Sequence, residues 1–533
     1  MTSKNTNSEK FKLQNKNKGA KDYMSDQNTH TTTITDVKQL STLAAIGSLS
    51  YVFWICGGME MIERLAFYGV RSLSSLYATD SAANGGLGLI ESDLGIIFMV
   101  WALVQTFVPV FTGGISDRYG YKETIFASTV FKIIGYLIMA FYPTFSGFMI
   151  GAIVLAFGTG IFKPGLQGTI VKSTDRTNSS IAWGVFYQTV NIGAFLGPLI
   201  AAQLRQLEWQ YVFFACAAII SINFLLLLSY KEEGKEERLA HRAKVASGEI
   251  KEGSLLVESL KELKNPVLLW YIFLFSGFWF MLMAFWDVAP LYFRDWVDTT
   301  VMVNYLFGSE GTQNGFVIFF LGMAQDGMTI KPEGLVNINA GIIMTICFLV
   351  AGFSAKIRAT TSMALGTFFA SAALIIIGGF NFVWAIVAAI VVFSFGEMLS
   401  SPKCSEYLGN IAPNQKKAMY LGFTQIPLGI GWVAEGYLGP TLYGEYSSKE
   451  NISRQLLIDG GNDVSTVPIG EAFTKLVEVT GQTAESLTAS MYASNDIGLV
   501  WYIMGAVGLI TTFGLYVYSN WTYRFAKELE AQA

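Results

Sequence analysis

The feature that most constrains this chain is a series of long apolar segments that recurs along almost its whole length. Each segment is about 20 residues or longer, which is the length that an α-helix needs to cross the hydrocarbon core of a bilayer. A membrane span of this kind satisfies all its backbone hydrogen bonds internally. The sequence therefore predicts an all-α membrane protein with twelve transmembrane helices, at residues 45–78, 92–113, 122–142, 145–173, 183–203, 209–230, 267–293, 333–355, 360–379, 381–409, 416–440 and 496–523.

Composition agrees with a membrane protein. Of the 533 residues, 52% are hydrophobic and only 14% are charged, whereas soluble domains carry about a quarter charged residues. The 53 glycines are typical of helices that pack closely in lipid. A net charge of −4 gives no reason to expect a nucleic-acid partner. We expect the chain to be a multi-pass protein of a plasma membrane or bacterial inner membrane, surrounded by the lipid bilayer.

The basic residues of the connections predict the orientation. Lys and Arg are frequent in the run KEEGKEERLAHRAKVASGEIKEG at 231–253 and absent from the connection at 79–93. Because basic connections stay in the cytoplasm, both termini are expected there. The predicted organisation is a disordered cytoplasmic tail at 1–42, an N-terminal six-helix bundle at 43–230, a charged cytoplasmic linker at 231–266, and a C-terminal six-helix bundle at 267–526 with extracellular loops at 294–332 and 440–495.

A charged stretch, EMIERLAFYGVR at 60–71, interrupts the first apolar segment. Its charges are Glu60, Glu63, Arg64 and Arg71, at offsets that fall along one face of a helix. A charge at the centre of a membrane helix costs about 3 kcal/mol, so this stripe must face water or partner charges. Two interpretations stay open: a functional site, or an ion-pair network between helices that binds no ligand.

Four further polar residues lie inside apolar segments: Lys163, Asp287, Asn339 and Glu397. Lys163 could extend to an interface, or it could add a second cation beside Arg64 in a site suited to an anion. Glu397 is suited to titrate or to bind an ammonium group. Asp287 is either an interface carboxylate or a functional acid, and Asn339 either joins two helices by a hydrogen bond or contacts a ligand.

The connection GGISDRYGYK at 113–122 resembles the loop signature of the major facilitator superfamily, and the two six-helix halves resemble its layout. The signature positions are expected to brace the cytoplasmic side during conformational change and not to bind substrate: Gly113, Asp117, Arg118, Gly120 and Lys122.

Four segments in both halves resemble the proton-dependent oligopeptide transporters, a branch of that superfamily. EMIERLAFYG is similar to its ExxERFxYYG signature, and GTGIFKPG to its fourth-helix FKPN segment. FYQTVNIGAFLGPLIA is similar to its fifth-helix segment, and GEMLSSPKCSEYLGNIAP to its tenth-helix segment. The resemblance implies proton-coupled import of di- and tripeptides by alternating access.

Roles follow from the same resemblance. Proton coupling would involve Glu60, Glu63 and Arg64, and an outer gate would pair Arg71 with Asp287. The arginine and lysine would hold the peptide carboxylate, and Glu397 and Asn339 its amino terminus. The implied substrate-binding residues are Arg64, Tyr68, Lys163, Asn339 and Glu397.

The sequence also departs from the family pattern at four positions. Leu65 and Phe67 replace aromatic residues of the signature, Gly165 replaces the asparagine of FKPN, and Ala340 replaces a proline. These changes indicate a divergent member, so a same-fold transporter of a carboxylate or drug-like solute stays an alternative, as does a transport-inactive receptor or scaffold. We expect no enzyme activity, no metal, no cofactor other than the proton gradient, and a monomer.

Overall fold

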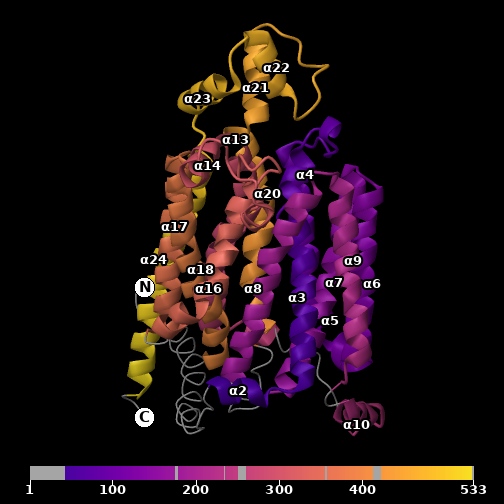
Figure 1. The fold of residues 1–533 in the computed structure, drawn as a ribbon. Coiled ribbons are helices and arrows are strands. Elements are labelled where there is room, and N and C mark those ends of the chain that lie inside the picture. Colours follow the sequence, from indigo (N-terminus) through magenta and orange to yellow (C-terminus); the bar gives the residue numbers. More distant parts are fainter. Residues whose placement is uncertain are drawn as a thin grey trace, which may run out of the picture.

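The structure is a computed structural model, and it describes residues 42–174, 178–232, 235–249, 260–354, 357–411, 420 and 422–530. These residues form an elongated bundle of long helices with smaller helices at both ends (Figure 1). Within the described ranges, β pairing is limited to an isolated bridge between Met323 and Ile330. The predicted all-α class is confirmed for this part of the chain, and the predicted tail lies outside it except for Thr42.

Twelve of the described helices have 21 residues or more. The first helix group consists of α3 (Tyr51–Arg71), α5 (Glu91–Tyr119), α6 (Tyr121–Phe141), α7 (Phe145–Lys172), α8 (Ser179–Leu204) and α9 (Trp209–Ser229). The second helix group consists of α12 (Pro266–Asp287), α16 (Pro332–Ser354), α17 (Ala359–Gly379), α18 (Val383–Ile411), α20 (Gln425–Tyr446) and α24 (Leu499–Glu530).

Nine of these helices, counted over the described residues, contain an apolar stretch long enough to cross a membrane. The other three are α3, α16 and α20, which bury polar side chains such as Glu63, Asn337 and Glu435. A bundle of this apolarity belongs in a bilayer, and the polar side chains of these three helices are buried inside the protein.

Two predicted helices are divided into shorter ones. The segment at 45–78 becomes the end of α2 (Thr42–Ser48), α3 and the short α4 (Ser74–Thr79), where the Ser74 hydroxyl donates to the Val70 carbonyl at 2.9 Å. The segment at 267–293 becomes α12 and α13 (Ala289–Trp296), with Pro290 in the first turn of α13. Proline lacks a backbone N–H and favours the start of a helix over its interior, which explains the second break.

Short helices mark the two ends of the bundle. Within the predicted loops at 294–332 and 440–495 lie α14 (Thr300–Phe307), α15 (Gly315–Phe320), α21 (Lys449–Asp459), α22 (Ala472–Thr480) and α23 (Ala484–Ser494). We call the end that carries α4, α13 and α21 the α21 end. The helices α2 (Thr42–Ser48) and α10 (Lys235–Ala246) lie at the opposite end, the α10 end (Figure 1).

Glycines bring α3 and α8 into close contact. A Cβ atom added at Gly193 or Gly197 of α8 would overlap the backbone carbonyl of Met61 or Leu65 in α3. Small residues of this kind allow two membrane helices to approach closely. Between the two groups, α5 packs on α20 and α8 packs on α16. The charged helix α3 is thereby held beside α8, one of the two helices that meet the second group.

Candidate functional site

Three charges of α3 form a buried cluster in the first helix group. Glu60, Glu63 and Arg64 are each at most 5% exposed. Arg64 Nε lies 3.2 Å from Glu60 Oε1, and the Arg64 guanidinium also contacts the Glu63 carboxylate. The predicted stripe therefore faces the protein interior, where its charges neutralise one another.

Lys132 of α6 completes this cluster, and the prediction missed it. Its Nζ lies 2.9 Å from Glu63 Oε1 and 3.8 Å from the centre of the Phe162 ring, and its side chain is 1% exposed. Gly158 of α7 leaves room for it, because an added Cβ there would come within 2.9 Å of Lys132 Cγ. The signal was present in the sequence: Lys132 is a lone cation in a long apolar run.

Lys163 of α7 lies in the electrostatic range of the same three α3 charges. Unlike Lys132, it is partly exposed, and no ion pair is formed by it among the described residues. When all groups are ionised, three cations (Arg64, Lys132, Lys163) face two carboxylates, so the cluster carries one surplus positive charge. A surplus cation with an accessible side chain is suited to bind an anion.

Aromatic rings flank the α3 charges. The Arg64 guanidinium carbon lies 4.9 Å from the centre of the Phe67 ring and 5.9 Å from that of Tyr68. Phe67 also packs edge-on against Trp101, with ring centres 6.1 Å apart. The phenylalanine that replaces a family tyrosine is thus a buried packing surface for Arg64.

The departure at Gly165 lies away from the cluster. A Cβ added there would be 3.5 Å from Ile125 Cγ1 and from Ser116 Oγ. Position 165 therefore faces the junction of α5 and α6. The glycine at this position therefore bears on the packing of α7 against α5 and α6.

The second helix group contributes Glu397 and Asn339. Asn339 Nδ2 donates to Glu397 Oε2 at 3.1 Å and to Ser394 Oγ at 3.1 Å. Asn339 is fully buried, whereas Glu397 is partly exposed. Tyr68 of the first group lies near both Arg64 and Glu397, so it connects the two sets of charges.

A second buried cluster lies toward the α21 end. Arg71, the last residue of α3, contacts the carboxylate of Asp287, the last residue of α12. Glu435 of α20 lies beside Asp287. Of these three residues, the sequence interpretation paired the first two and overlooked Glu435.

Further polar contacts join the two groups at the α21 end. Arg205 binds Glu333 through two hydrogen bonds of 2.7 and 3.1 Å. Asn451 Nδ2 donates to Glu91 Oε2 at 3.2 Å. The first contact links the end of α8 to the start of α16, and the second links the start of α5 to α21.

Arg294 of α13 adds to the same set of contacts. It donates to Thr79 Oγ1 at 2.9 Å and forms an ion pair of 2.7 Å with Asp295. Burial alone would raise the pKa of Asp295, but Arg294 and a hydrogen bond from Tyr443 outweigh it and hold that pKa below its ordinary value. Asp295 is thus kept ionised and positions Arg294 against Thr79 of α4.

The predicted conformational loop is described in part. Gly113, Asp117 and Arg118 lie in α5, but the part of the chain whose side chains are described does not include them. Gly120 separates α5 from α6 with φ of 120°, a conformation that favours glycine. Lys122 Nζ donates to the Tyr230 carbonyl at 3.3 Å, which ties the start of α6 to the end of α9.

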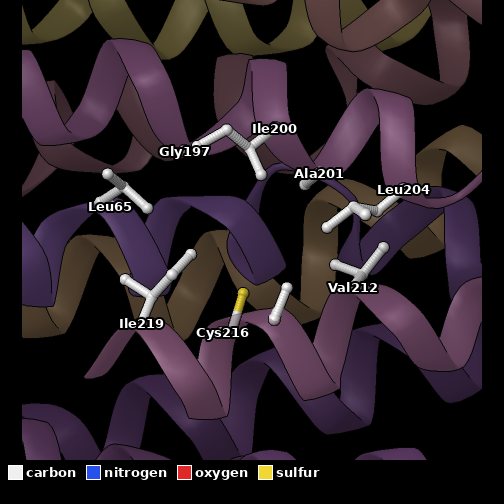
Figure 2. A pocket seen from close by; sticks show the side chains of 9 residues that line it. Leu65, Gly197, Ile200, Ala201, Leu204, Val212, Cys216 and Ile219 are labelled. Carbon is white, nitrogen blue, oxygen red and sulfur yellow. The ribbon is translucent and has the colours of Figure 1, made fainter. Parts of the chain in front are cut away.

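An apolar crevice, lined by no charged residue, lies between α3, α8 and α9 (Figure 2). Its lining is aliphatic apart from the Cys216 thiol: Leu65, Gly197, Ile200, Ala201, Leu204, Val212, Ala215, Cys216 and Ile219. A lining without charged groups is unsuited to the ends of a peptide. Among the described residues, no cluster of His, Cys, Asp or Glu is arranged to hold a metal ion.

A bundle of long apolar helices that buries charged side chains in its interior is typical of a multi-pass membrane protein. The Major Facilitator Superfamily model matches residues 61–435, which is more than half of the chain, and the chain belongs to this superfamily. Within it, the likeness to curated bacterial peptide transporters supports a place in the proton-dependent oligopeptide transporter branch.

Two curated bacterial relatives match part of the chain. An uncharacterized transporter YclF of Bacillus subtilis is 27% identical over 165 residues, covering 30% of this chain and 33% of the relative. The peptide transporter YePEPT of Yersinia enterocolitica is 29% identical over 161 residues, covering 29% of this chain and 31% of the relative. The chain thus aligns with about a third of the length of these relatives.

A crystal structure of a peptide transporter POT in complex with sulfate has the same fold. It superposes with a TM-score of 0.63 at 15% sequence identity, covering 92% of this chain and 99% of that one. At this identity, the similarity establishes the fold alone.

Proposed function

We propose that the protein is a proton-coupled symporter that imports di- and tripeptides, or similar small zwitterions, by alternating access. The observation that carries the proposal is the distribution of charge. The first helix group carries a surplus cation at Lys163, and the second carries the partly exposed carboxylate Glu397. A zwitterion carries a negative charge that can pair with Lys163 and a positive charge that can pair with Glu397. It therefore binds best when both helix groups are close to it.

In this proposal, Lys163 and Arg64 bind the peptide carboxylate, and Glu397 with Asn339 binds the amino group. Tyr68 lies beside both sets and contacts the backbone of the peptide. The homology to peptide transporters supports this assignment, and the pairing of opposite charges supplies the physical reason.

Proton coupling is assigned to Glu60 and Glu63. Protonation of either glutamate removes a negative charge, which weakens its ion pair with Arg64 and frees the guanidinium for substrate. Glu63 has two cationic partners, Arg64 and Lys132, whereas Glu60 has an ion pair with Arg64 alone among the described residues. Protonation of Glu60 therefore breaks fewer contacts, and we assign the first proton to it.

We further propose twelve transmembrane helices with both termini in the cytoplasm, so that the α21 end faces outward. The basic connections support this orientation. The pairs Arg71–Asp287, Arg205–Glu333 and Arg294–Thr79 then close the outer side, and their separation opens it. Rocking of one helix group against the other supplies the alternating access.

Uptake into liposomes tests the proposal. The purified protein is reconstituted, an inward proton gradient is imposed, and entry of a labelled dipeptide is measured with and without a protonophore. We expect uptake above that of protein-free liposomes, and we expect the protonophore to abolish the excess.

Two other outcomes would separate the alternatives. Gradient-driven uptake of another solute without any peptide uptake would contradict the peptide assignment and retain a same-fold transporter. Phe67, which lacks the hydroxyl of the family tyrosine and packs on Arg64, is the observation that favours such a solute. No movement of any solute would favour a receptor or scaffold.

A further inference from the structure

The short helices α14 and α15 leave large apolar side chains uncovered by protein. Tyr305 of α14 is 79% exposed, and Phe316 of α15 is 73% exposed. On each helix a second exposed apolar residue lies one turn away, Val301 on α14 and Phe320 on α15. The rings of Phe316 and Phe320 stack with their centres 5.7 Å apart. Exposed apolar surface of this kind marks a contact with another molecule or with a membrane.

The α14–α15 segment (residues 299–325) differs in charge from the other short helices of the α21 end. It contains one charged residue, Glu310, and no basic residue. By contrast, α21 has four charged residues among eleven, and α22 has two among nine. The composition of α21 and α22 is typical of a surface in water, whereas that of the α14–α15 segment is typical of a surface in contact with lipid.

The position of α14 agrees with a lipid contact. Figure 1 shows α14 beside the end of α17, with α21, α22 and α23 further from the bundle. The Tyr305 ring lies edge-on to that of Trp384, the second residue of the membrane helix α18, with ring centres 5.5 Å apart. Phe380 and Phe382, which connect α17 to α18, are also exposed. Because aromatic residues concentrate where membrane helices meet the headgroups, Tyr305 continues an aromatic surface of the bundle that faces lipid.

Both helix groups hold the α14–α15 segment. On the side of the second group, α14 packs on α18. On the side of the first group, α15 packs on α8, where the Phe320 ring centre lies 5.3 Å from that of Phe195. Gln203 Nε2 of α8 also donates to the Met323 carbonyl at 3.4 Å. The segment is thus fixed along the bundle with the exposed faces of its two helices unpartnered.

We propose that α14 and α15 lie in the headgroup region of the bilayer at the α21 end, with Tyr305, Phe316 and Phe320 inserted toward the acyl chains. The partner is the phospholipid that surrounds the bundle. Because the segment has no basic residue, the contact rests on apolar insertion and not on attraction to anionic headgroups. Part of the connection at 294–332 therefore belongs to the membrane surface, and this inference does not depend on the proposed function.

Fluorescence quenching in liposomes tests the lipid contact. Phe316→Cys and Tyr305→Cys are prepared separately, labelled with a fluorescent NBD maleimide and reconstituted in phosphatidylcholine. The wild type, labelled in the same way, corrects for its own cysteines. A fraction of the phosphatidylcholine then carries a nitroxide near the top of an acyl chain. We expect the labels at 305 and 316 both to lose fluorescence, because a nitroxide quenches at short range.

Two further positions calibrate the measurement. Val479→Cys is the matched control, because Val479 is also an exposed apolar residue but belongs to the charged helix α22. Its label should keep its fluorescence in the nitroxide lipid and lose it to iodide added in the buffer. Ile510→Cys is the positive control, because Ile510 is exposed within the membrane span of α24, and its label should lose fluorescence to the nitroxide.

Retention of fluorescence in the nitroxide lipid by the label at either 305 or 316 would overturn the proposal. Quenching of that label by iodide would then place its helix in water, and protection from both quenchers would place it against protein, such as a second copy of the chain. The readout requires no movement of solute. Lipid quenching at both positions would therefore support the proposal even if dipeptide uptake fails, and its absence would overturn the proposal even if uptake succeeds.

Discussion

Lys132 and Glu63 form an ion pair that is almost completely buried, with both side chains 1% exposed. Taking two charges out of water is costly, and their attraction offsets that cost only while both partners are present. Glu63 also contacts Arg64, so the loss of Lys132 would leave a carboxylate with one cation where it now has two. At the scale of single residues, the cluster is therefore a set of mutually dependent charges.

Replacement of Lys132 by methionine, which has a similar length, should destabilise the protein. Removing one partner of a buried ion pair costs about 3–5 kcal/mol, so we expect a clearly lower midpoint of thermal unfolding. The double variant Lys132→Met/Glu63→Gln should be more stable than Lys132→Met, because it also removes the buried carboxylate that loses its ion pair with Lys132.

The matched control for this change is Lys475→Met. Lys475 pairs with Glu478 on the surface of α22, where its side chain is 49% exposed. Exposed pairs contribute about 0–1 kcal/mol, so the control should unfold close to the wild type. If Lys132→Met unfolds at the same temperature as the control, the cluster does not depend on Lys132.

At the scale of helices, glycine contacts determine how α3 packs against α8. The added Cβ at Gly193 would meet the Met61 carbonyl and come within 2.9 Å of Arg64 Cβ. Backbone atoms cannot move aside as a flexible side chain can. The position of Arg64 relative to Lys132 and Lys163 is therefore fixed by the close approach of α8 to α3.

Gly193→Ala should separate these helices and lower both stability and uptake. Gly58→Ala in α3 is the matched control, because its added Cβ would meet only Leu226 Cδ1, at an ordinary 3.5 Å. Both changes gain about 1 kcal/mol of helix propensity, so a difference between them reports the contact. Equal thermal stability of the two variants, measured in the same detergent, would contradict the proposed role of this interface.

The sequence could predict most helices because their apolar runs are bounded by charged or polar residues, as α6 and α9 illustrate. It could have predicted the break before α13 from Pro290. Lys163 and Glu397 could be recognised because each is a charged residue inside a long apolar run. The same rule should have identified Lys132. The partnership of Glu435 with Asp287 could not be read in this way, because the two acids are distant in sequence and meet only when α20 packs on α12.

At the scale of the whole molecule, the charged residues divide between two groups that touch at the α21 end. Arg71–Asp287 joins α3 to α12, Arg205–Glu333 joins the end of α8 to α16, and Arg294–Thr79 joins α13, which follows α12, to α4, which follows α3. The substrate charges are divided in the same way, with Lys163 in the first group and Glu397 in the second. A ligand that binds both charges, and a proton that alters the ion pairs of α3, would each change the balance between the two positions of the groups.

The central claim is that one peptide and one or more protons move together through these charges. It is tested most directly by loading reconstituted liposomes with a pH-sensitive dye and recording the proton entry that a dipeptide drives. The wild type should acidify the interior on addition of peptide, whereas Lys163→Ala and Glu397→Ala should each abolish that flux, with Lys475→Ala and Glu478→Ala as surface controls. Flux at the wild-type rate in either Lys163→Ala or Glu397→Ala would contradict the account.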